Sequence, residues 1–557
     1  MKNIFILPLT ILIFCLIPSC SDSFLDEKPL DFMSGENSYE TKKDFEASVA
    51  TLYYLIRREF YDRDDYRPYD YLYGTDIVFD GQPHAQRHTN MVAAYHPTGY
   101  VIVEHWRLLY KLISEANTII SRLPESQVEA EDKVILEAKA KFFRAFGYRT
   151  LAYLYGGVPI YKEEVTSAKV DYVRASRNEV LEFAIEDLEF ASKNLPEITK
   201  VRDGEISNLA AYHLLSEVYI ANKQYKEAVQ AASTVINNSE MKLMENRFGS
   251  RANENPGDVY WDLFRKNNQN RASGNKESIW VIQFEVDVDG GGLQSGDIGG
   301  SYRLERHHAP FVRDVKANGM NPFTWPISDY TGGRGIGWAI STKYFTDAIW
   351  QSDFDNDIRN ANHNFVRKFK VTNANYASRY GDTISTQDPP PGVKVPSREF
   401  YAYQTKCTTP YNHPENLYDN KQNFLLKSTA GGTYTDQYMF RLAETYLLRA
   451  EAYLGDGDKG NAAKDINVVR QRANASPVQS GDVNIEYILD ERMRELGVEE
   501  KRRLTLMRLG LIYERVKKCN PYYANEIQEY HNLWPIPQGE IEANHGAVLE
   551  QNPGYEQ

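Results

Sequence analysis

The stretch of sequence that decides the fold is AAYHLLSEVY, residues 210–219, which has a counterpart in LLRAEAY, residues 447–453. In both, a serine or alanine precedes a tyrosine by three positions, and an alanine follows that tyrosine by nine positions. Small residues on either side of a bulky aromatic let two helices approach closely, which is the register of a tetratricopeptide-type hairpin. The sequence therefore predicts two helical hairpins, over 207–222 with 224–237 and over 440–455 with 459–473.

Helical periodicity of apolar residues extends on both sides of these hairpins. One of the helices stops at Gly156-Gly157, with Pro159 just beyond, where glycine permits a left-handed exit and proline prevents continuation. The further helices are expected at about 42–61, 105–122, 127–155, 177–194, 484–496 and 499–516. We therefore predict a mainly α protein with a tetratricopeptide-like helical repeat scaffold.

Two stretches lack this periodicity. Residues 62–104 are expected to form a long loop region, and residues 245–435 an irregular insert of loops and short strands, such as one at 279–284. The insert holds five of the seven tryptophans, and irregular segments on a regular scaffold often carry recognition. We expect one domain over 41–557, with its scaffold at about 41–244 and 436–557.

The N-terminus has the pattern of an export signal. Lys2 is followed by an apolar run over 4–17 that is too short to span a bilayer, and then by Pro-Ser-Cys ending at Cys20. This pattern predicts a lipoprotein signal peptide over 1–19, acyl chains on Cys20, and a polar spacer over 20–40. An ordinary signal peptide, cut elsewhere, stays open as the alternative.

Composition excludes some functions. The formal net charge of −13 does not suit binding to nucleic acid or to anionic lipid. Removal of a leader would leave Cys407 and Cys519 as the internal thiols, which form one bridge or none.

No motif for metal or nucleotide chemistry stands out. The chain has neither a His-Glu-x-x-His pattern nor paired Cys-x-x-Cys motifs, so no zinc site is predicted. The glycine-rich run GRGIG, residues 333–337, lacks the strand and helix context of a phosphate loop. No cofactor and no catalytic residue are predicted.

An acidic run resembles the start of a calcium loop. Asp353, Asp355 and Asp357 alternate, but Ile358 and Asn364 stand where an EF-hand needs glycine and glutamate. The run is therefore predicted to be a solvated or salt-bridged turn, with Arg359 as a partner for its carboxylates. Structural calcium elsewhere, for example near Asp287 and Asp289, stays open.

Taken together, motifs along the whole chain resemble those of SusD/RagB-like nutrient-binding lipoproteins of Bacteroidetes. The resemblance is weakest over 245–435. The motifs are SCSDSFLD (19–26), FRAF (143–146), LYGGVPI (154–160), the hairpin stretch at 210–219, RLAETYLLRAEA (441–452), INVVRQRA (466–473), ERMREL (491–496), WPIP (534–537) and QNPGY (551–555).

The resemblance implies a cell-surface glycan-binding protein. Such a protein is anchored by lipid in the outer membrane and faces outward. It passes oligosaccharide or polysaccharide to a SusC-like TonB-dependent transporter, and it performs no bond chemistry. Three alternatives stay open: a peptide-binding RagB-type relative, a helical scaffold without a ligand of its own, and an enzyme.

The resemblance places the ligand site in the loop before residue 105 and in the insert. Sugar rings present apolar C–H faces that suit Trp and Tyr rings, and their hydroxyls suit polar side chains. Candidates in the loop are Tyr66, Tyr69, Tyr71, Tyr73, Arg87, Asn90 and Tyr95; those in the insert are Tyr302, Trp325, Tyr330, Arg334 and Trp338. Trp106, Trp261, Trp280 and Trp350 lie in apolar patterns and are expected in the core.

Overall fold

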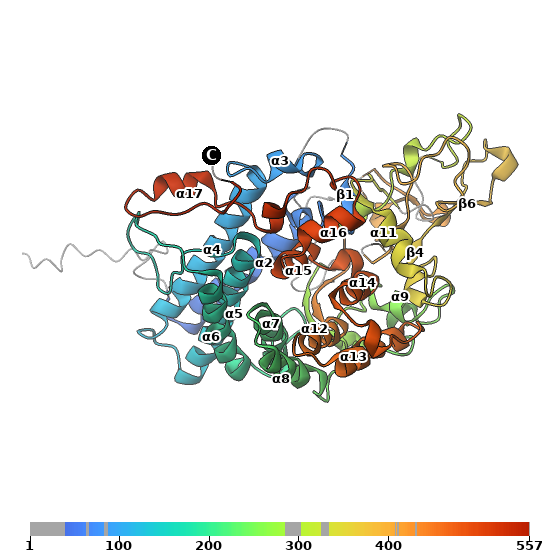
Figure 1. Cartoon of the computed structure of the whole chain (residues 1–557). Coiled ribbons are helices and arrows are strands. Elements are labelled where there is room, and N and C mark those ends of the chain that lie inside the picture. Colours follow the sequence, from blue (N-terminus) through green and yellow to red (C-terminus); the bar gives the residue numbers. More distant parts are fainter. Residues whose placement is uncertain are drawn as a thin grey trace, which may run out of the picture.

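The fold was examined in a computed structural model. It describes residues 39–62, 66–82, 87–284, 302–324, 333–406, 408, 411–428, 430 and 432–555. Layers of helices make up one part of the molecule, and a part with loops and short strands lies beside them (Figure 1). This arrangement confirms the predicted fold class.

Most of the described helices belong to the scaffold. The first group is α2 (Lys42–Tyr61), α4 (Tyr100–Arg122), α5 (Ala130–Tyr155), α6 (Arg177–Asn194), α7 (Asn208–Ala221) and α8 (Tyr225–Ile236). The second group is α12 (Leu442–Gly455), α13 (Lys459–Arg472), α14 (Ile485–Glu495), α15 (Arg502–Arg508), α16 (Ile512–Cys519) and α17 (Gln538–Ala543). Short helices lie between them: α3 (Met91–Ala94), α9 (Val259–Leu263), α10 (Leu304–His308) and α11 (Lys343–Thr346).

The two hairpins of the opening motif are neighbours in space. Helix α7 packs on α8, α8 on α12, and α12 on α13, so the distant pairs form one stack. The alanines nine positions after each tyrosine, Ala228 and Ala462, are completely buried. Arg449 on α12 joins the pairs, because it binds Asp465 on α13 at 2.7 Å and donates to the Ser233 hydroxyl on α8 at 3.0 Å.

Helix ends follow local chemistry. Helices α2 and α6 begin with capping boxes at Thr41 and Ser176, and α5 ends at Gly156 with φ of 76°. Two expected boundaries were wrong. Helix α4 begins at Tyr100 because Val101 and Ile102 already point into the core, and the helix expected over 499–516 is divided at Gly510, whose φ is +67°.

The strands form two-stranded antiparallel pairs within the described ranges. The pairs are β1 (Val78–Asp80) with β3 (Ala339–Ser341), β2 (Ser278–Ile282) with β10 (Gln437–Arg441), β4 (Phe365–Val366) with β7 (Tyr403–Gln404), β5 (Lys368–Lys370) with β6 (Thr383–Ser385), and β8 (Tyr418–Asn420) with β9 (Leu425–Leu426). The β1–β3 pair brings part of residues 62–104, which we call the tyrosine-rich loop, beside the insert. In this pair Phe79 lies opposite Ile340. Residues 62–104 thus hold short elements within the expected loop.

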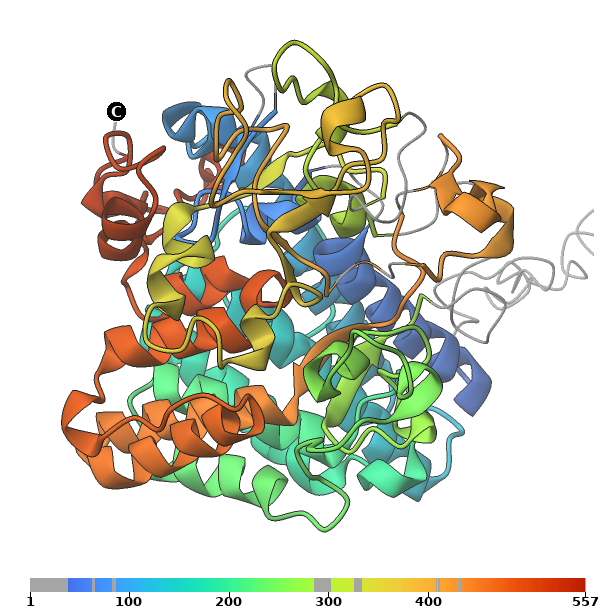
Figure 2. The same ribbon diagram turned by 90° about the vertical axis from the view of Figure 1, so that its right-hand side faces the viewer.

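Scaffold and insert share a continuous apolar core. The four tryptophans that were expected in the core are buried, with exposed fractions between 1% and 4%: Trp106, Trp261, Trp280 and Trp350. Figure 2 shows the yellow strands of the insert above the green and orange helix pairs. Among the described residues, none of the helices combines the length and apolar character needed to cross a bilayer.

The insert is also joined to the scaffold by buried ion pairs. Arg359, which is completely buried, binds Asp357 at 2.7 Å, Glu491 at 2.9 Å and Glu495 at 3.0 Å. Arg470 on α13 binds Asp353 at 2.7 Å. The prediction of a salt-bridged acidic turn is therefore confirmed, and the part of the chain that the structure describes holds no group of acidic, His or Cys side chains suited to a metal.

Candidate functional site

The twelve predicted ligand residues fall into distinct groups. Trp325 and Tyr330 lie outside the described residues, as do Cys20 and Cys407. Asn90 is exposed and caps α3, where its side chain accepts from the Ala93 N–H at 3.1 Å. Five tyrosines are buried, and four residues meet near the surface of the insert.

The buried group consists of tyrosine rings that pack on the protein itself. Tyr69 stacks on Tyr302 with ring centroids 5.4 Å apart, and the Tyr95 hydroxyl accepts a hydrogen bond from the Arg503 guanidinium at 2.5 Å. The exposed fraction is no more than 1% for each of Tyr69, Tyr71, Tyr73, Tyr95 and Tyr302. These rings have no exposed face in this conformation. Their contact with a ligand therefore stays a prediction, and their burial argues against it.

A buried charged cluster holds the tyrosine-rich loop in place. The Asp70 carboxylate contacts His88 at 2.7 Å, His105 at 3.0 Å and the Arg87 guanidinium. Burial opposes the charged form of His105, but the Glu59 and Asp70 carboxylates outweigh it and raise its pKa to about 9. Arg87 also contacts the Glu104 carboxylate at 3.4 Å, so carboxylates of this buried cluster hold its guanidinium in place.

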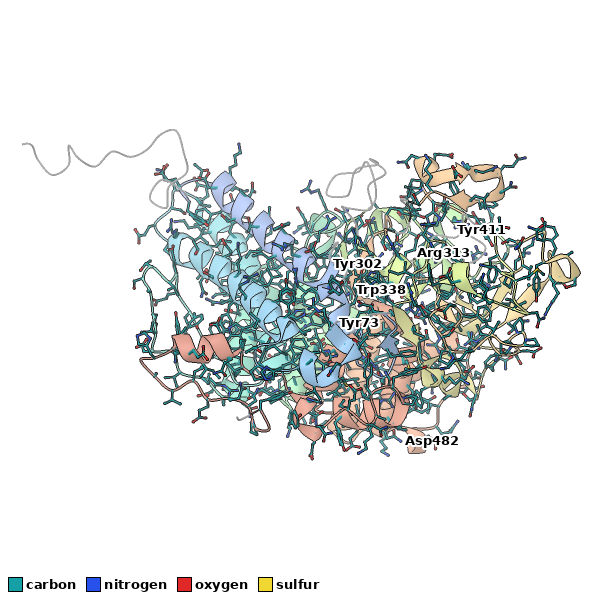
Figure 3. The ribbon with its side chains drawn as sticks, turned by 90° about the horizontal axis from the view of Figure 1, so that it is seen from above. Tyr73, Tyr302, Arg313, Trp338, Tyr411 and Asp482 are labelled. Atoms are coloured by element: carbon teal, nitrogen blue, oxygen red, sulfur yellow. The ribbon has the colours of Figure 1, made fainter. Side chains whose placement is uncertain are left out.

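Tyr66, Arg87 and Trp338 form an aromatic–cation cluster. The Tyr66 and Trp338 rings are nearly parallel, at 16°, with centroids 6.3 Å apart. The Arg87 guanidinium carbon lies 5.6 Å from the centroid of the Tyr66 ring. Figure 3 shows Trp338 near the middle of the molecule, with Arg313 on the side of the insert.

Trp338 also lines a cavity of about 240 Å³. Four arginines from separate segments surround it. The lining residues are Arg306, Phe311, Arg313, Arg334, Gly335, Ile336, Trp338 and Arg398. We call this space the arginine cavity; it unites the predicted residues Arg334 and Trp338.

Backbone contacts fix the wall that carries Arg334 and Trp338. The N–H groups of Ile336, Gly337 and Trp338 donate to the carbonyls of Arg306, Ala309 and His307 at 2.8, 2.9 and 3.0 Å. Gly337 has φ of +62°, and a Cβ there would lie 2.1 Å from the Arg398 carbonyl oxygen. The glycine-rich run thus serves close backbone packing.

Two of the arginines are arranged around a ring. The guanidinium carbons of Arg398 and Arg313 lie 4.4 and 4.8 Å from the Phe311 centroid. Arg398 also donates from Nε to the Ile336 carbonyl at 2.9 Å. Burial, with Arg306 and Arg313 nearby, lowers the pKa of Arg334 to about 10, so like charges act on one another here.

Larger cavities exist elsewhere but do not contain the predicted residues. One of about 510 Å³ lies between scaffold helices and includes Tyr225, Arg508 and Asn532 in its lining. Another of about 300 Å³ is lined by residues such as Lys343, Asp347 and Tyr401. Size alone does not select the site; the combination of an indole ring and convergent polar donors favours the arginine cavity.

Sequence reasoning missed Arg306, Phe311, Arg313 and Arg398. The one local signal was the frequency of arginine shortly after Tyr302. Arg398 contacts a residue 62 positions away, and no short-range pattern reports such a contact.

Comparison with known proteins places the chain in a family. Residues 276–555 match the model of the SusD family, and residues 23–220 match a family described as starch-binding and associating with the outer membrane. The chain belongs to the SusD family. The resemblance noted in the sequence is thereby confirmed.

Relatives within the SusD family are similar over different lengths. SusD-like protein P25 of Formosa agariphila is 24% identical and the match covers 97% of this chain and 98% of the relative. The starch-binding protein SusD of Bacteroides thetaiotaomicron is 38% identical over 136 residues, which is 23% of this chain and 24% of that protein.

Solved SusD-like structures have the same fold. A laminarin-binding SusD-like protein superposes with a TM-score of 0.66 at 20% identity, covering 93% of this chain and 100% of that one. Surface glycan-binding protein A of Bacteroides thetaiotaomicron, in complex with laminarihexaose, gives 0.65 at 19% identity, covering 92% and 99%.

Proposed function

We propose that this SusD-family protein captures oligosaccharide or polysaccharide at the cell surface. The observation that carries the proposal is the Tyr66–Trp338 ring pair beside the arginine cavity. An indole or phenol ring suits the C–H face of a sugar, and guanidinium groups donate to its oxygens. Two of the similar proteins are a starch-binding and a laminarin-binding protein, which supports a carbohydrate as the ligand class.

The proposal assigns binding to the site, without bond chemistry. The arginines that line the cavity are donors that stay protonated, and no general acid–base pair or nucleophile stands among the described residues of that lining. The family membership supports the same conclusion. Cleavage of a glycan by the pure protein would contradict it.

The proposal extends to location and partner. Cys20 would carry acyl chains that hold the protein in the outer membrane, facing outward, and residues 20–40 would act as the tether. The description of the family matched by residues 23–220, associating with the outer membrane, supports this location. Delivery to a SusC-like TonB-dependent transporter rests on the family resemblance.

The test of glycan capture is retention in affinity gels and calorimetry with a panel of soluble glycans. Replacing Trp338 by alanine removes one ring of the pair and should weaken binding about tenfold or more, roughly 1.5 kcal/mol. Trp338→Phe keeps an aromatic face and should retain most of the affinity. Tyr54→Ala, at an exposed ring on α2, is the matched control and should bind like the original chain.

The outcomes separate the alternatives. Unchanged retention in Trp338→Ala, in a protein that melts normally, would place glycan binding elsewhere. Peptide binding without retention of any glycan would favour the peptide-binding alternative.

A further inference from the structure

Another cavity of the insert has a lining rich in hydroxyl and amide groups. Its volume is about 300 Å³, and all of its lining residues belong to the stretch 333–406, which the structure describes without a gap. Ser341, Thr346 and Thr386 bring hydroxyl groups to this lining, and Gln387 brings an amide. We call this space the hydroxyl cavity. It shares no lining residue with the arginine cavity.

The charges of the hydroxyl cavity balance. Among the described residues that line it, Lys343 is the cation and Asp347 the carboxylate. Lys343 is exposed, and Asp347 is half-buried and accepts from the Thr346 hydroxyl at 2.9 Å. One charge of each sign, beside hydroxyl and amide groups that both donate and accept, matches a neutral ligand with many hydroxyl groups.

A buried hydroxyl on the lining lacks a partner. Ser341 is completely buried, and its Oγ has no hydrogen-bond partner within the described residues. The next residue, Thr342, is held by its own hydroxyl, which donates to the Asp76 carbonyl at 2.9 Å. A buried hydroxyl without a hydrogen bond costs free energy. Because Ser341 lines the cavity, an occupant with oxygen atoms can form the missing bond.

Apolar groups complete the lining. They belong to Val395, Pro396 and Ala402. A sugar unit has C–H groups beside its hydroxyls, so it needs apolar surface as well as hydrogen-bond partners. The volume of about 300 Å³ lies at the lower end of the roughly 300–1,000 Å³ of small-ligand pockets. This size suits a short part of a longer glycan.

Contacts within the protein hold the lining in place. The Tyr401 hydroxyl donates to the His308 carbonyl at 2.8 Å. The Thr386 N–H donates to the Arg367 carbonyl at 2.9 Å. A site that is already formed loses less conformational freedom when a ligand binds.

The two cavities lie on different sides of one extended segment. Trp338 lines the arginine cavity and Ser341 the hydroxyl cavity, and side chains three positions apart in an extended chain point to opposite faces. Trp338 continues the pairing of β3 with β1, because its carbonyl accepts from the Gly81 N–H at 2.7 Å. The loop with Arg398 in the arginine cavity brings Val395 to the hydroxyl cavity. Both cavities can therefore be occupied at once.

We propose that the hydroxyl cavity is a second sugar-binding site, which takes a neutral sugar unit and lets the protein hold a polysaccharide at two points. This inference rests on the proposed function and adds to it a second site with its ligand class. Sugar hydroxyls would donate to the Asp347 carboxylate, accept from the Lys343 ammonium and the Gln387 amide, and bond the Ser341 hydroxyl. Two weak sites on one long chain give a much higher overall affinity than either site alone.

Saturation-transfer NMR with small sugars tests the second site. The probes are D-glucose, D-galactose, D-mannose, D-xylose, maltose and laminaribiose. At least one probe should still bind the Trp338→Ala variant, whose first site is weakened. Adding Lys343→Ala and Gln387→Ala to that variant should raise the remaining Kd at least about tenfold, because a charged and a neutral hydrogen bond are lost.

A matched control removes the same side-chain types outside both linings. Lys316→Ala with Gln351→Ala, placed in the Trp338→Ala variant, should leave the remaining Kd unchanged. Lys343, Gln387, Lys316 and Gln351 are all exposed, so neither pair of substitutions should change the melting temperature.

Polymers test whether the chain is held at two points. Amylopectin, laminarin, mannan, galactan and xylan contain the units of the small probes. In affinity gels, Lys343→Ala with Gln387→Ala should lower retention by the polymer of the probe that binds, although Trp338 is present, because loss of either site removes the gain from two-point binding. Retention equal to that of the original chain would overturn the two-point hold.

The two proposals fail in different ways. Binding that Trp338→Ala abolishes, or residual binding that Lys343→Ala with Gln387→Ala leaves unchanged, would overturn the second site and leave glycan capture intact. A cavity that holds only water predicts these results. Absence of binding between the original chain and every sugar and polymer of the set would contradict the proposed function itself.

Discussion

Gly337 shows how one residue sets the position of the site. Its left-handed backbone turns the chain between Arg334 and Trp338, and the missing Cβ lets the Arg398 carbonyl come close. The same close approach brings Arg398 beside the cavity, where its Nε donates to the Ile336 carbonyl. Conformational freedom at a single glycine thus determines the geometry of three side chains of the candidate site.

Gly337→Ala should therefore destabilise the protein by roughly 2–4 kcal/mol, because an L side chain at this φ costs about 1–2 kcal/mol and the carbonyl must also move. Urea unfolding measures the loss. Gly392→Ala, with φ of +85° and no atom within 4 Å of the added Cβ, separates backbone strain from the clash. Gly481→Ala, which has neither problem, should be nearly neutral; equal losses for 337 and 392 would show that the clash is unimportant.

Whether the loop tyrosines are exposed or buried could not be predicted from the residues of the loop alone. A run such as Tyr69 to Tyr73 has the same composition whether its rings face water or pack on one another. The structure leaves Tyr66 half-buried and places the rings of Tyr69, Tyr71 and Tyr73 in the core. The deciding partners, Tyr302 and Arg503, are far away in the chain.

At the scale of elements, local rules predicted the helices well. Helices α2 and α6 have the expected bounds because their caps and apolar stripes depend only on residues that are close in the sequence. The insert could be predicted only as irregular, since its short strands pair with distant partners, as β1 does with β3. Four of the predicted site residues meet, and the remaining arginines of the cavity depend on the same long-range pairing.

Helix α14 joins the insert to the scaffold through Glu495. Its carboxylate, completely buried, binds Arg441 at 2.6 Å and Arg359 at 3.0 Å, and also contacts Arg472. Burial alone would raise its pKa, but the three arginines outweigh this effect and lower the pKa to about 2 from an ordinary 4.5. A depressed carboxyl pKa stabilises the fold above about pH 4.5, and that contribution is lost as the pH falls toward 2.

Glu495→Gln should consequently lower the free energy of unfolding by roughly 3–5 kcal/mol at pH 7, because it leaves buried arginines without their charge partner. The difference from the original chain should shrink at pH 3, where the linked stability is already partly lost. Urea unfolding at both pH values measures it. Glu197→Gln, in an exposed pair with Lys200, should cost less than about 1 kcal/mol, and a loss for Glu495→Gln that is equally small or independent of pH would contradict this account.

At the scale of the whole molecule, the proposed anchor and the candidate binding site belong to different parts of the chain. The proposed lipid attachment at Cys20 lies outside the described residues, and within those residues the first helix starts at Lys42. Location and ligand binding should therefore separate experimentally.

Cys20→Ala should release the protein from the membrane fraction and from surface labelling, without a change in glycan binding in solution, because only the acyl attachment is removed. Cell fractionation and surface protease treatment measure the location. Cys15→Ala, within the predicted leader, is the matched control and should remain anchored. A Cys20→Ala protein that stays in the membrane fraction would refute lipid attachment at this residue.

The contacts that hold the tyrosine-rich loop in place also determine when, during synthesis, the loop can take its final position. Arg502 binds Asp76 at 2.8 Å, Arg503 donates to the Asp70 carbonyl at 2.7 Å, and Asn520 donates to the Thr75 carbonyl at 2.7 Å. During synthesis, which runs from the N-terminus, these partners do not exist until the ribosome has passed residues 502, 503 and 520. The loop that holds Tyr66 is made early and fixed late, because its partners lie 426 or more positions further along the chain.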